Sequence, residues 1–217
     1  DYGSTGITIS GYLYGKLSMN INFGNTSYDS FVLNVMVDDD ADNAKQVWVH
    51  AGDTNVTLLE GLGRGHHRVE ITRGAGNCGT LTMKDITYTG TLATPTVNPL
   101  QIEFIGDSIT ASDGMLIKAY GAPSMNTFLG YAAKTARAIG ANVNNVAVSG
   151  AKTAAMRDRF NNWTGENVQK QIVVINLGTN DFGWSTSATA STQSGLKDTC
   201  LGLIADVRAK YGADTYI

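Results

Sequence analysis

The sequence predicts a mixed fold, in which an antiparallel β-sandwich is followed by an α/β domain. Through residue 90, short runs of alternating β-branched residues show no helical period, whereas beyond residue 100 strand-like runs alternate with helical patterns. Residues 91–100 lie between these parts and hold two of the three prolines. We therefore predict a β-sandwich domain over residues 1–90, a linker over 91–100 and an α/β domain over 101–217.

The sandwich is predicted from about seven short strands that are separated by Gly, Asn and Asp. These strands are Thr8–Ser10, Leu17–Phe23, Phe31–Val37, Val47–Val49, Val56–Leu59, His67–Thr72 and Leu81–Tyr88. Strands at this spacing are typical of antiparallel sandwiches.

The second domain is predicted from parallel strands and helices. The expected strands are Ile102–Ile105, Val143–Val148 and Ile172–Leu177. Helical patterns cover about residues 126–139, ending at Gly140, and about residues 194–210. Asp214–Ile217 reads as the start of a fourth strand. Because sheets of this kind usually have five or more strands, we expect residues 1–217 to be a fragment whose missing part completes the fold and the site.

Composition excludes several classes of function. Apolar residues make up 42% of the chain and charged residues 16%, which suits a packed core and not a disordered protein. The net charge of −3 leaves no basic surplus for nucleic acid, and no apolar run approaches the ~20 residues that cross a bilayer. Cys78 and Cys200 have no metal-ligand or redox spacing, so we expect both to be unpaired. We expect no cofactor and no metal.

The strongest functional signal is Gly106-Asp107-Ser108-Ile109-Thr110, which directly follows the first parallel strand. Ligands of open α/β sheets bind at the carboxyl ends of the strands. Gly106 permits a sharp turn, and Asp107 can hold that turn by side-chain hydrogen bonds. Taken alone, the segment could also be an ordinary Asp/Ser loop cap.

Two more segments end at the same edge of the predicted sheet, Ser149-Gly150 after the second strand and Gly178–Asp181 after the third. Acyl transfer requires hydrogen-bond donors aimed at a developing oxyanion. The backbone N–H groups of Ser108 and Gly150 and the amide of Asn180 can supply three. Gly150 and Asn180 could each be turn residues, but their joint placement after consecutive strands favours a site.

These segments resemble the motif blocks of the SGNH (GDSL-type) hydrolases, in which Ser108 matches the catalytic serine, and Gly150 and Asn180 match the oxyanion residues. The whole chain is similar to family 2 of the carbohydrate esterases, and Met156–Phe160 is typical of it. The resemblance implies an N-terminal jelly roll and a three-layer α/β/α, flavodoxin-like SGNH domain. It further implies a secreted enzyme that removes acetyl groups from plant cell-wall polysaccharides (xylan, glucomannan or mannan) without a metal.

The resemblance also implies a catalytic histidine in a fourth block, yet no histidine follows Ser108. A serine hydroxyl is a poor nucleophile without a general base. His50, His66 and His67 belong to the β domain, where we expect surface or strand-edge roles. We therefore expect the base beyond residue 217, and little or no esterase turnover from residues 1–217 alone.

Two tryptophans and two aspartates each have alternative interpretations. Trp184 follows the third block in a polar loop, where stacking on a sugar and core packing are equally favoured, whereas Trp163 is expected in the core. Asp107 is the other candidate for substrate binding. Asp107 and Asp181 could also form a carboxylate pair for glycosidic cleavage or metal binding. We set this interpretation aside, because loop geometry explains the presence of each aspartate.

The acidic run Asp38–Asp40, followed by Asp42, suggests a calcium loop. It lacks the glycine and the distal glutamate of an EF-hand. A solvated hairpin loop is favoured, and calcium binding stays open as the alternative.

The sequence leaves two alternative functions open. One is another SGNH activity, a lipid esterase or thioesterase, which would need an apolar acyl pocket. The other is a carbohydrate-binding β module joined to an inactive hydrolase remnant. The sequence leaves the oligomeric state undetermined.

Overall fold

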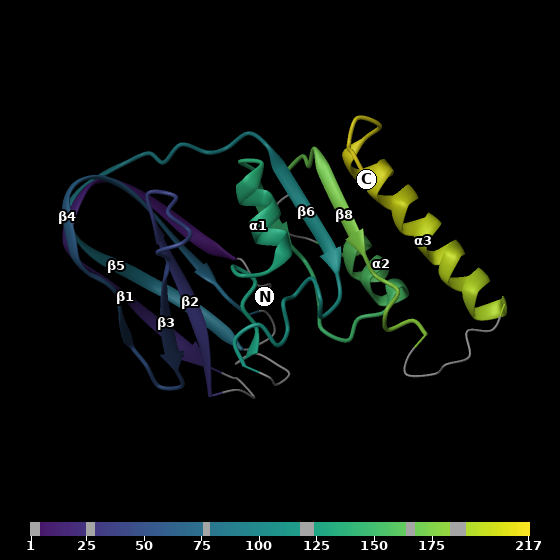
Figure 1. The fold of residues 1–217 in the computed structure, drawn as a ribbon, viewed down its shortest axis with the longest axis horizontal. Coiled ribbons are helices and arrows are strands. Elements are labelled where there is room, and N and C mark those ends of the chain that lie inside the picture. Colours follow the sequence, from purple (N-terminus) through teal and green to yellow (C-terminus); the bar gives the residue numbers. More distant parts are fainter. Residues whose placement is uncertain (1–4, 25–28, 76–78, 118–123, 164–167, 183–189) are drawn as a thin grey trace. The chain divides into compact units, whose positions relative to one another are not determined.

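The computed structural model describes residues 5–24, 29–75, 79–117, 124–163, 168–182 and 190–217 (Figure 1). The chain forms two compact units. The first, here the β unit, comprises Asp1–Val97 and Gly114–Leu129, and the second, here the α/β unit, comprises Asn98–Asp113 and Gly130–Ile217. The segment Gly114–Leu129 therefore groups with the β unit, although its neighbours on both sides in the chain belong to the α/β unit.

The β unit contains one five-stranded antiparallel sheet with the strand order β3-β2-β4-β1-β5. Its strands are β1 (Gly6–Gly24), β2 (Ser30–Val37), β3 (Lys45–His50), β4 (Asn55–Arg73) and β5 (Thr80–Ala93). The antiparallel β architecture of the first part is thus confirmed, while the jelly-roll arrangement stays a prediction.

Five long strands replace the seven short strands that the sequence predicts, because β1 and β4 each join two of them. Gly15 in β1 has a φ of 76° and Gly61 in β4 a φ of 72°. The pairing of β1 with β4 shifts register around Gly15. Glycines with positive φ inside a ladder mark bulges, where an extra residue bends a strand without ending it.

One face of this sheet forms the apolar core of the β unit. Side chains of β1, such as Leu13 and Ile21, pack there with Phe31 of β2 and Leu58 of β4, all almost fully buried. Met125, from the segment Gly114–Leu129, belongs to the same cluster.

The α/β unit contains a three-stranded parallel sheet with the order β7-β6-β8. Its strands are β6 (Gln101–Gly106), β7 (Asn142–Asn145) and β8 (Ile172–Asn176), and its helices are α1 (Tyr131–Ala138), α2 (Thr153–Asn161) and α3 (Ala190–Tyr211). All three predicted strands are observed, although the second ends at Asn145 and not at Val148 as predicted. Tyr216 forms a parallel bridge with Ile172, so the expected start of a further strand is also observed.

Helices cover both faces of this sheet (Figure 1). Ile102 and Phe104 of β6 pack against Ala132 and Ala136 of α1. Neighbouring residues of a strand point to opposite faces. Glu103 accordingly accepts a 2.9 Å hydrogen bond from the hydroxyl of Tyr211 at the end of α3. The three-layer α/β/α arrangement is therefore confirmed. Burial raises the pKa of Glu103, against the opposing effect of the Tyr211 hydrogen bond.

The first predicted helix is shorter than expected. It begins at Tyr131 instead of at residue 126 and ends at Ala138, and Ile139, the last residue of the predicted range, is 45% exposed. Asn126 accepts a hydrogen bond from the backbone N–H of Phe128 through its side chain, which favours a turn over a helix. Gly140 has a φ of 63° directly after the helix end, as predicted for a cap.

Three smaller expectations can also be compared with the structure. Trp163 is 40% exposed, so its predicted place in the core is wrong. Cys200 is free and half-buried, whereas Cys78 lies outside the described residues. Among the described residues, no helix has the length and apolarity that a bilayer crossing requires.

Candidate active site

Ser108 lies on a tight turn, Asp107–Asp113, which we call the serine turn and which directly follows β6. The Asp107 carboxylate is 1% exposed and accepts a 3.0 Å hydrogen bond from the backbone N–H of Ile109. The backbone N–H of Asp113 donates to the carbonyl of Ser108 at 3.0 Å, which closes the turn. Asp107 thus shapes the turn from inside, as expected, and its side chain is not at a surface that a substrate could reach.

The serine side chain itself is accessible. Ser108 is half-buried, and its neighbour Ile109 is 55% exposed. Among the described residues, no group forms a hydrogen bond with the Ser108 hydroxyl. The hydroxyl is therefore not covered by packed hydrocarbon, as a nucleophile requires.

Gly106 is needed for a close approach within the turn. A Cβ atom at this position would lie 2.1 Å from the Oγ1 of Thr110. Such a distance is far inside van der Waals contact, so only glycine allows the chain to reverse here.

The second segment, Val148–Ala151, is hydrogen-bonded to both ends of the region around Ser108. The backbone N–H of Val148 donates to the carbonyl of Gly106 at 3.0 Å. The Ser149 hydroxyl donates to the Asp113 carboxylate at 2.8 Å. Gly150 has a φ of 75° and no atom within 4 Å of a hypothetical Cβ. Its backbone conformation, and not crowding by neighbouring atoms, therefore accounts for glycine here.

The third segment, Gly178–Asp181, meets the second. The Asn180 side-chain amide donates to the carbonyl of Ala151 at 3.0 Å. The Asp181 carboxylate accepts from the backbone N–H of Thr153 at 3.1 Å and from its hydroxyl at 2.8 Å, which caps the start of α2. An amide NH₂ group carries two protons, and Ala151 uses one of those on Asn180. Among the described residues the other proton has no acceptor, so the amide can donate it to a ligand.

The structure therefore brings the three predicted segments together at the carboxyl edge of the parallel sheet. Their roles as nucleophile and oxyanion donors stay predictions. Trp184, the other candidate for substrate binding, lies outside the described residues.

A network behind the serine turn was not anticipated from the sequence. The Thr110 hydroxyl forms a 2.8 Å hydrogen bond with the Tyr131 hydroxyl, which also accepts from the Asn176 amide at 3.1 Å. The Thr110 carbonyl accepts a 2.9 Å hydrogen bond from Asn145. The signal for this network was the presence of asparagines at the ends of two strands, Asn145 in β7 and Asn176 in β8. These side chains hold the serine turn in place through hydrogen bonds.

The three histidines lie on strands of the β unit, His50 on β3 and the other two on β4. Both ring nitrogens of His67 have partners, the Asp38 carboxylate at 2.7 Å and the Gly63 carbonyl at 3.0 Å. The Asp38 hydrogen bond raises the pKa of His67. An imidazole held between two acceptors is stabilised as the cation and is not poised to act as a general base.

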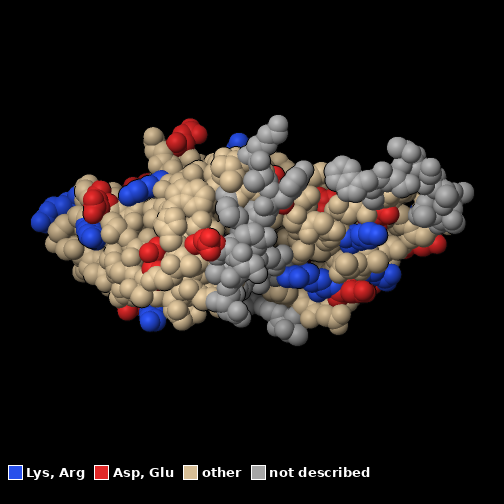
Figure 2. Space-filling model, turned by 90° about the horizontal axis from the view of Figure 1, so that it is seen from below, with Lys and Arg blue, Asp and Glu red and all other residues tan. Residues whose placement is uncertain are grey.

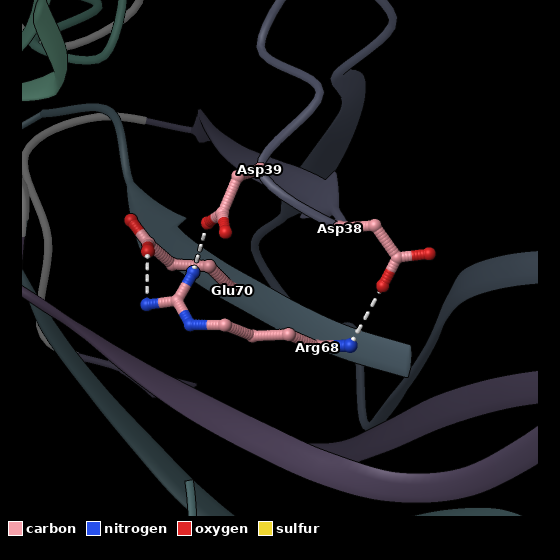
Figure 3. A network of polar contacts seen from close by, with 4 residues as sticks. All are labelled: Asp38, Asp39, Arg68 and Glu70. Carbon is pink, nitrogen blue, oxygen red and sulfur yellow. Dashed lines mark hydrogen bonds and ion pairs between the residues drawn. The ribbon is translucent and has the colours of Figure 1, made fainter. Parts of the chain in front are cut away.

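The acidic loop at residues 38–40 has partners other than a metal (Figure 3). Asp38 accepts from the backbone N–H of Arg68 at 2.8 Å, and Asp39 pairs with the Arg68 guanidinium, which also reaches Glu70. Asp40 accepts two hydrogen bonds from Asn43. Within the described ranges, no cluster of three or more His, Cys, Asp or Glu residues could hold a metal ion. The loop is a hydrogen-bonded hairpin turn.

Comparison with known proteins identifies the family. The GDSL-like Lipase/Acylhydrolase family matches residues 104–216. The chain is 32% identical over 187 residues to the Cellulase/esterase CelE of Acetivibrio thermocellus, and the match covers 75% of this chain and 22% of that protein. The chain therefore spans less than a quarter of this curated relative.

Solved structures share the fold. A family two carbohydrate esterase from Clostridium thermocellum, in complex with cellohexaose, has a TM-score of 0.82 at 26% identity, covering 97% of this chain and 69% of that chain. The acetyl xylan esterase Est2A from Butyrivibrio proteoclasticus has a TM-score of 0.78 at 15% identity, covering 99% and 72%, and resembles this chain in fold alone. The expected likeness to family 2 carbohydrate esterases is confirmed, and the chain belongs to the GDSL-like lipase/acylhydrolase family.

Proposed function

We propose that the protein is a secreted carbohydrate esterase that removes O-acetyl groups from plant cell-wall polysaccharides, namely xylan, glucomannan or mannan, by serine acyl transfer. One observation carries the proposal. The accessible serine turn accepts a hydrogen bond from Ser149 of the segment Val148–Ala151, and the same segment accepts a hydrogen bond from the Asn180 amide. The similarity to a carbohydrate esterase whose structure is in complex with cellohexaose supports a carbohydrate substrate.

In the proposed mechanism, the Ser108 hydroxyl attacks the acetyl carbonyl while a histidine that residues 1–217 do not contain takes its proton. The backbone N–H groups of Ser108 and Gly150 and the Asn180 amide stabilise the oxyanion. The sugar hydroxyl leaves, and water then hydrolyses the acetyl-enzyme by the same steps.

The charges on the face shown in Figure 2 agree with an uncharged substrate. On the face in Figure 2, Lys and Arg side chains are interspersed with Asp and Glu side chains among uncharged surface. A surface of mixed sign does not concentrate polyanions.

The test is acetate release by the full-length protein from acetylated xylan, glucomannan and mannan, with Ser108→Ala as the matched control. We expect release that the control abolishes. Comparison of acetyl with octanoyl p-nitrophenyl esters separates this function from a lipid esterase or thioesterase, and a preference for octanoyl would contradict the proposal. No acetate release, together with tight binding of polysaccharide, would favour a binding module beside an inactive hydrolase remnant.

A further inference from the structure

The outer face of the five-stranded sheet, opposite the apolar core, is only partly covered within the β unit. On β2, Asn34 is 1% exposed, because its side chain pairs with that of Asn126 at 3.0 and 2.9 Å. On β1, by contrast, Tyr12 is 39% exposed. Since Leu13 belongs to the core and neighbouring residues of a strand point to opposite faces, Tyr12 and Tyr14 lie on the outer face.

Four side chains from two paired strands form an exposed group here, which we call the Tyr12 cluster. Tyr12 is the partner of His66 of β4 in the sheet, and their rings meet edge to face with centroids 5.6 Å apart. The Tyr14 ring meets the Tyr12 ring in the same way, at 6.4 Å. The guanidinium carbon of Arg64 lies 4.1 Å from the centroid of the Tyr14 ring. All four residues belong to the β unit, so the cluster is built without any contribution from the α/β unit.

Arg64 is held in place while its hydrogen-bond donors stay free. The attraction between a guanidinium and the face of an aromatic ring uses none of the five N–H groups. Arg64 is exposed, and within the described part of the chain its guanidinium has no hydrogen-bond acceptor and no carboxylate partner. Arg68 of the same strand differs, because Asp39 at 2.6 Å and Glu70 at 3.1 Å pair with it (Figure 3). Arg64 is therefore an oriented cation that is open to an anion.

The exposed groups of the cluster suit different parts of one ligand. The Tyr12 side chain combines an apolar ring with a hydroxyl group, which matches the C–H face and the hydroxyl groups of a pyranose. A guanidinium pairs best with a carboxylate, through two parallel N–H bonds. Thr89 and Thr91 of β5, the sheet partners of Tyr14 and Tyr12, are exposed beside them and add uncharged hydroxyl groups. A sugar ring that carries a carboxylate fits all of these groups.

We propose that the Tyr12 cluster is a non-catalytic binding site for a hexuronate ring, which packs on Tyr12 while its carboxylate accepts hydrogen bonds from Arg64. Charge complementarity with the open guanidinium favours a uronate over a neutral sugar. Tyr14 is a positioning residue, because it holds the guanidinium. Such a site needs one oriented cation and no wider positive field. The inference goes beyond the proposed function, since it gives the β unit a recognition role that requires no turnover.

Calorimetry with the full-length protein in a Ser108→Ala background tests the site. The probes are a xylotetraose that carries one glucuronate side group and the same xylotetraose without it. We expect the parent to bind the glucuronate form about 10–100-fold more tightly, the range for a hydrogen-bonded pair that includes a charged group. Arg64→Gln should abolish this preference. Equal affinities in the parent, or a preference that survives Arg64→Gln, would overturn the proposal.

Variants of the two tyrosines test the apolar contact and the positioning role. Tyr12→Ser should weaken binding of the glucuronate form about tenfold, whereas Tyr12→Phe should keep most of the affinity. Tyr14→Leu should reduce the preference although the charge of Arg64 remains. Trp48→Ser is the matched control, since Trp48 is 40% exposed on β3, which pairs with neither β1 nor β4. Unchanged binding in Tyr12→Ser, or an equal loss in the control, would contradict the contact.

A competing polyanion separates a sugar site from a general attraction to negative charge. Polyglutamate at the same carboxylate concentration should show no binding that depends on Arg64. If Arg64→Gln weakens polyglutamate binding as much as binding of the glucuronate form, the assignment to a uronate is overturned. An Arg64-dependent preference in a protein whose Ser108 form releases no acetate would support the site and refute the proposed function alone.

Discussion

Replacing Gly106 with alanine tests how the serine turn is built. The new Cβ would lie 2.1 Å from the Thr110 Oγ1, whereas ordinary contact begins at 3.4 Å, so Thr110 must move by the difference of 1.3 Å. Thr110 is 0% exposed and hydrogen-bonded to Tyr131, so it has no free space to enter. Overpacking costs about 1–3 kcal/mol and a lost hydrogen bond about 0.5–1.5 kcal/mol. Together they predict a destabilisation of about 1.5–4.5 kcal/mol.

Native-state hydrogen exchange of the β6 amides measures this change in the α/β unit, and kcat with p-nitrophenyl acetate measures its effect on the turn. Gly195→Ala is the control. Gly195 lies in α3 with no atom within 4 Å of a new Cβ, so the same change should stabilise by about 0.5–1 kcal/mol. Unchanged protection of β6 in Gly106→Ala would refute the close packing of Gly106 on Thr110.

Three further predictions concern the oxyanion site, a helix cap and pH. Asn180→Ala should lower kcat for p-nitrophenyl acetate by about 100–1000-fold with little change in KM, and a loss below tenfold in steady-state assays would exclude an oxyanion role. Asp181→Ala removes the acceptor of the Thr153 N–H and hydroxyl, so urea unfolding should show a loss of about 1–3 kcal/mol, and an unchanged midpoint would contradict the cap. The Asp38 hydrogen bond raises the pKa of His67, so its stabilisation should be complete below pH ~6.5 and lost as the pH rises through the raised pKa. Urea unfolding across this range should show that decline in the parent and not in His67→Gln, and identical pH profiles would contradict it.

The order of the α/β elements and the three converging segments could be predicted from the sequence. In a parallel sheet the residues after each strand meet at one edge, so chain position alone places Ser108, Gly150 and Asn180 there. The hydrogen bond from Asn180 to Ala151 confirms that the second and third segments meet.

Strand lengths and the helix start could not be predicted, because non-local contacts decide them. The sequence predicts strand breaks between Ser10 and Leu17 and between Leu59 and His67. Only the pairing with neighbouring strands shows that the chain continues there through bulges at Gly15 and Gly61. Residues 126–129 have a helical pattern, but Asn126 pairs with Asn34, 92 residues away, and this buried pair overrides local propensity.

The central claim is that Ser108 is a nucleophile served by the Gly150 and Asn180 donors. Its most direct measurement is labelling of the full-length protein with a p-nitrophenyl phosphonate ester, followed by mass mapping of the modified peptide. The account predicts one label, on Ser108, that forms much more slowly in Asn180→Ala. Labelling of another residue, or an unchanged rate in that variant, would contradict it.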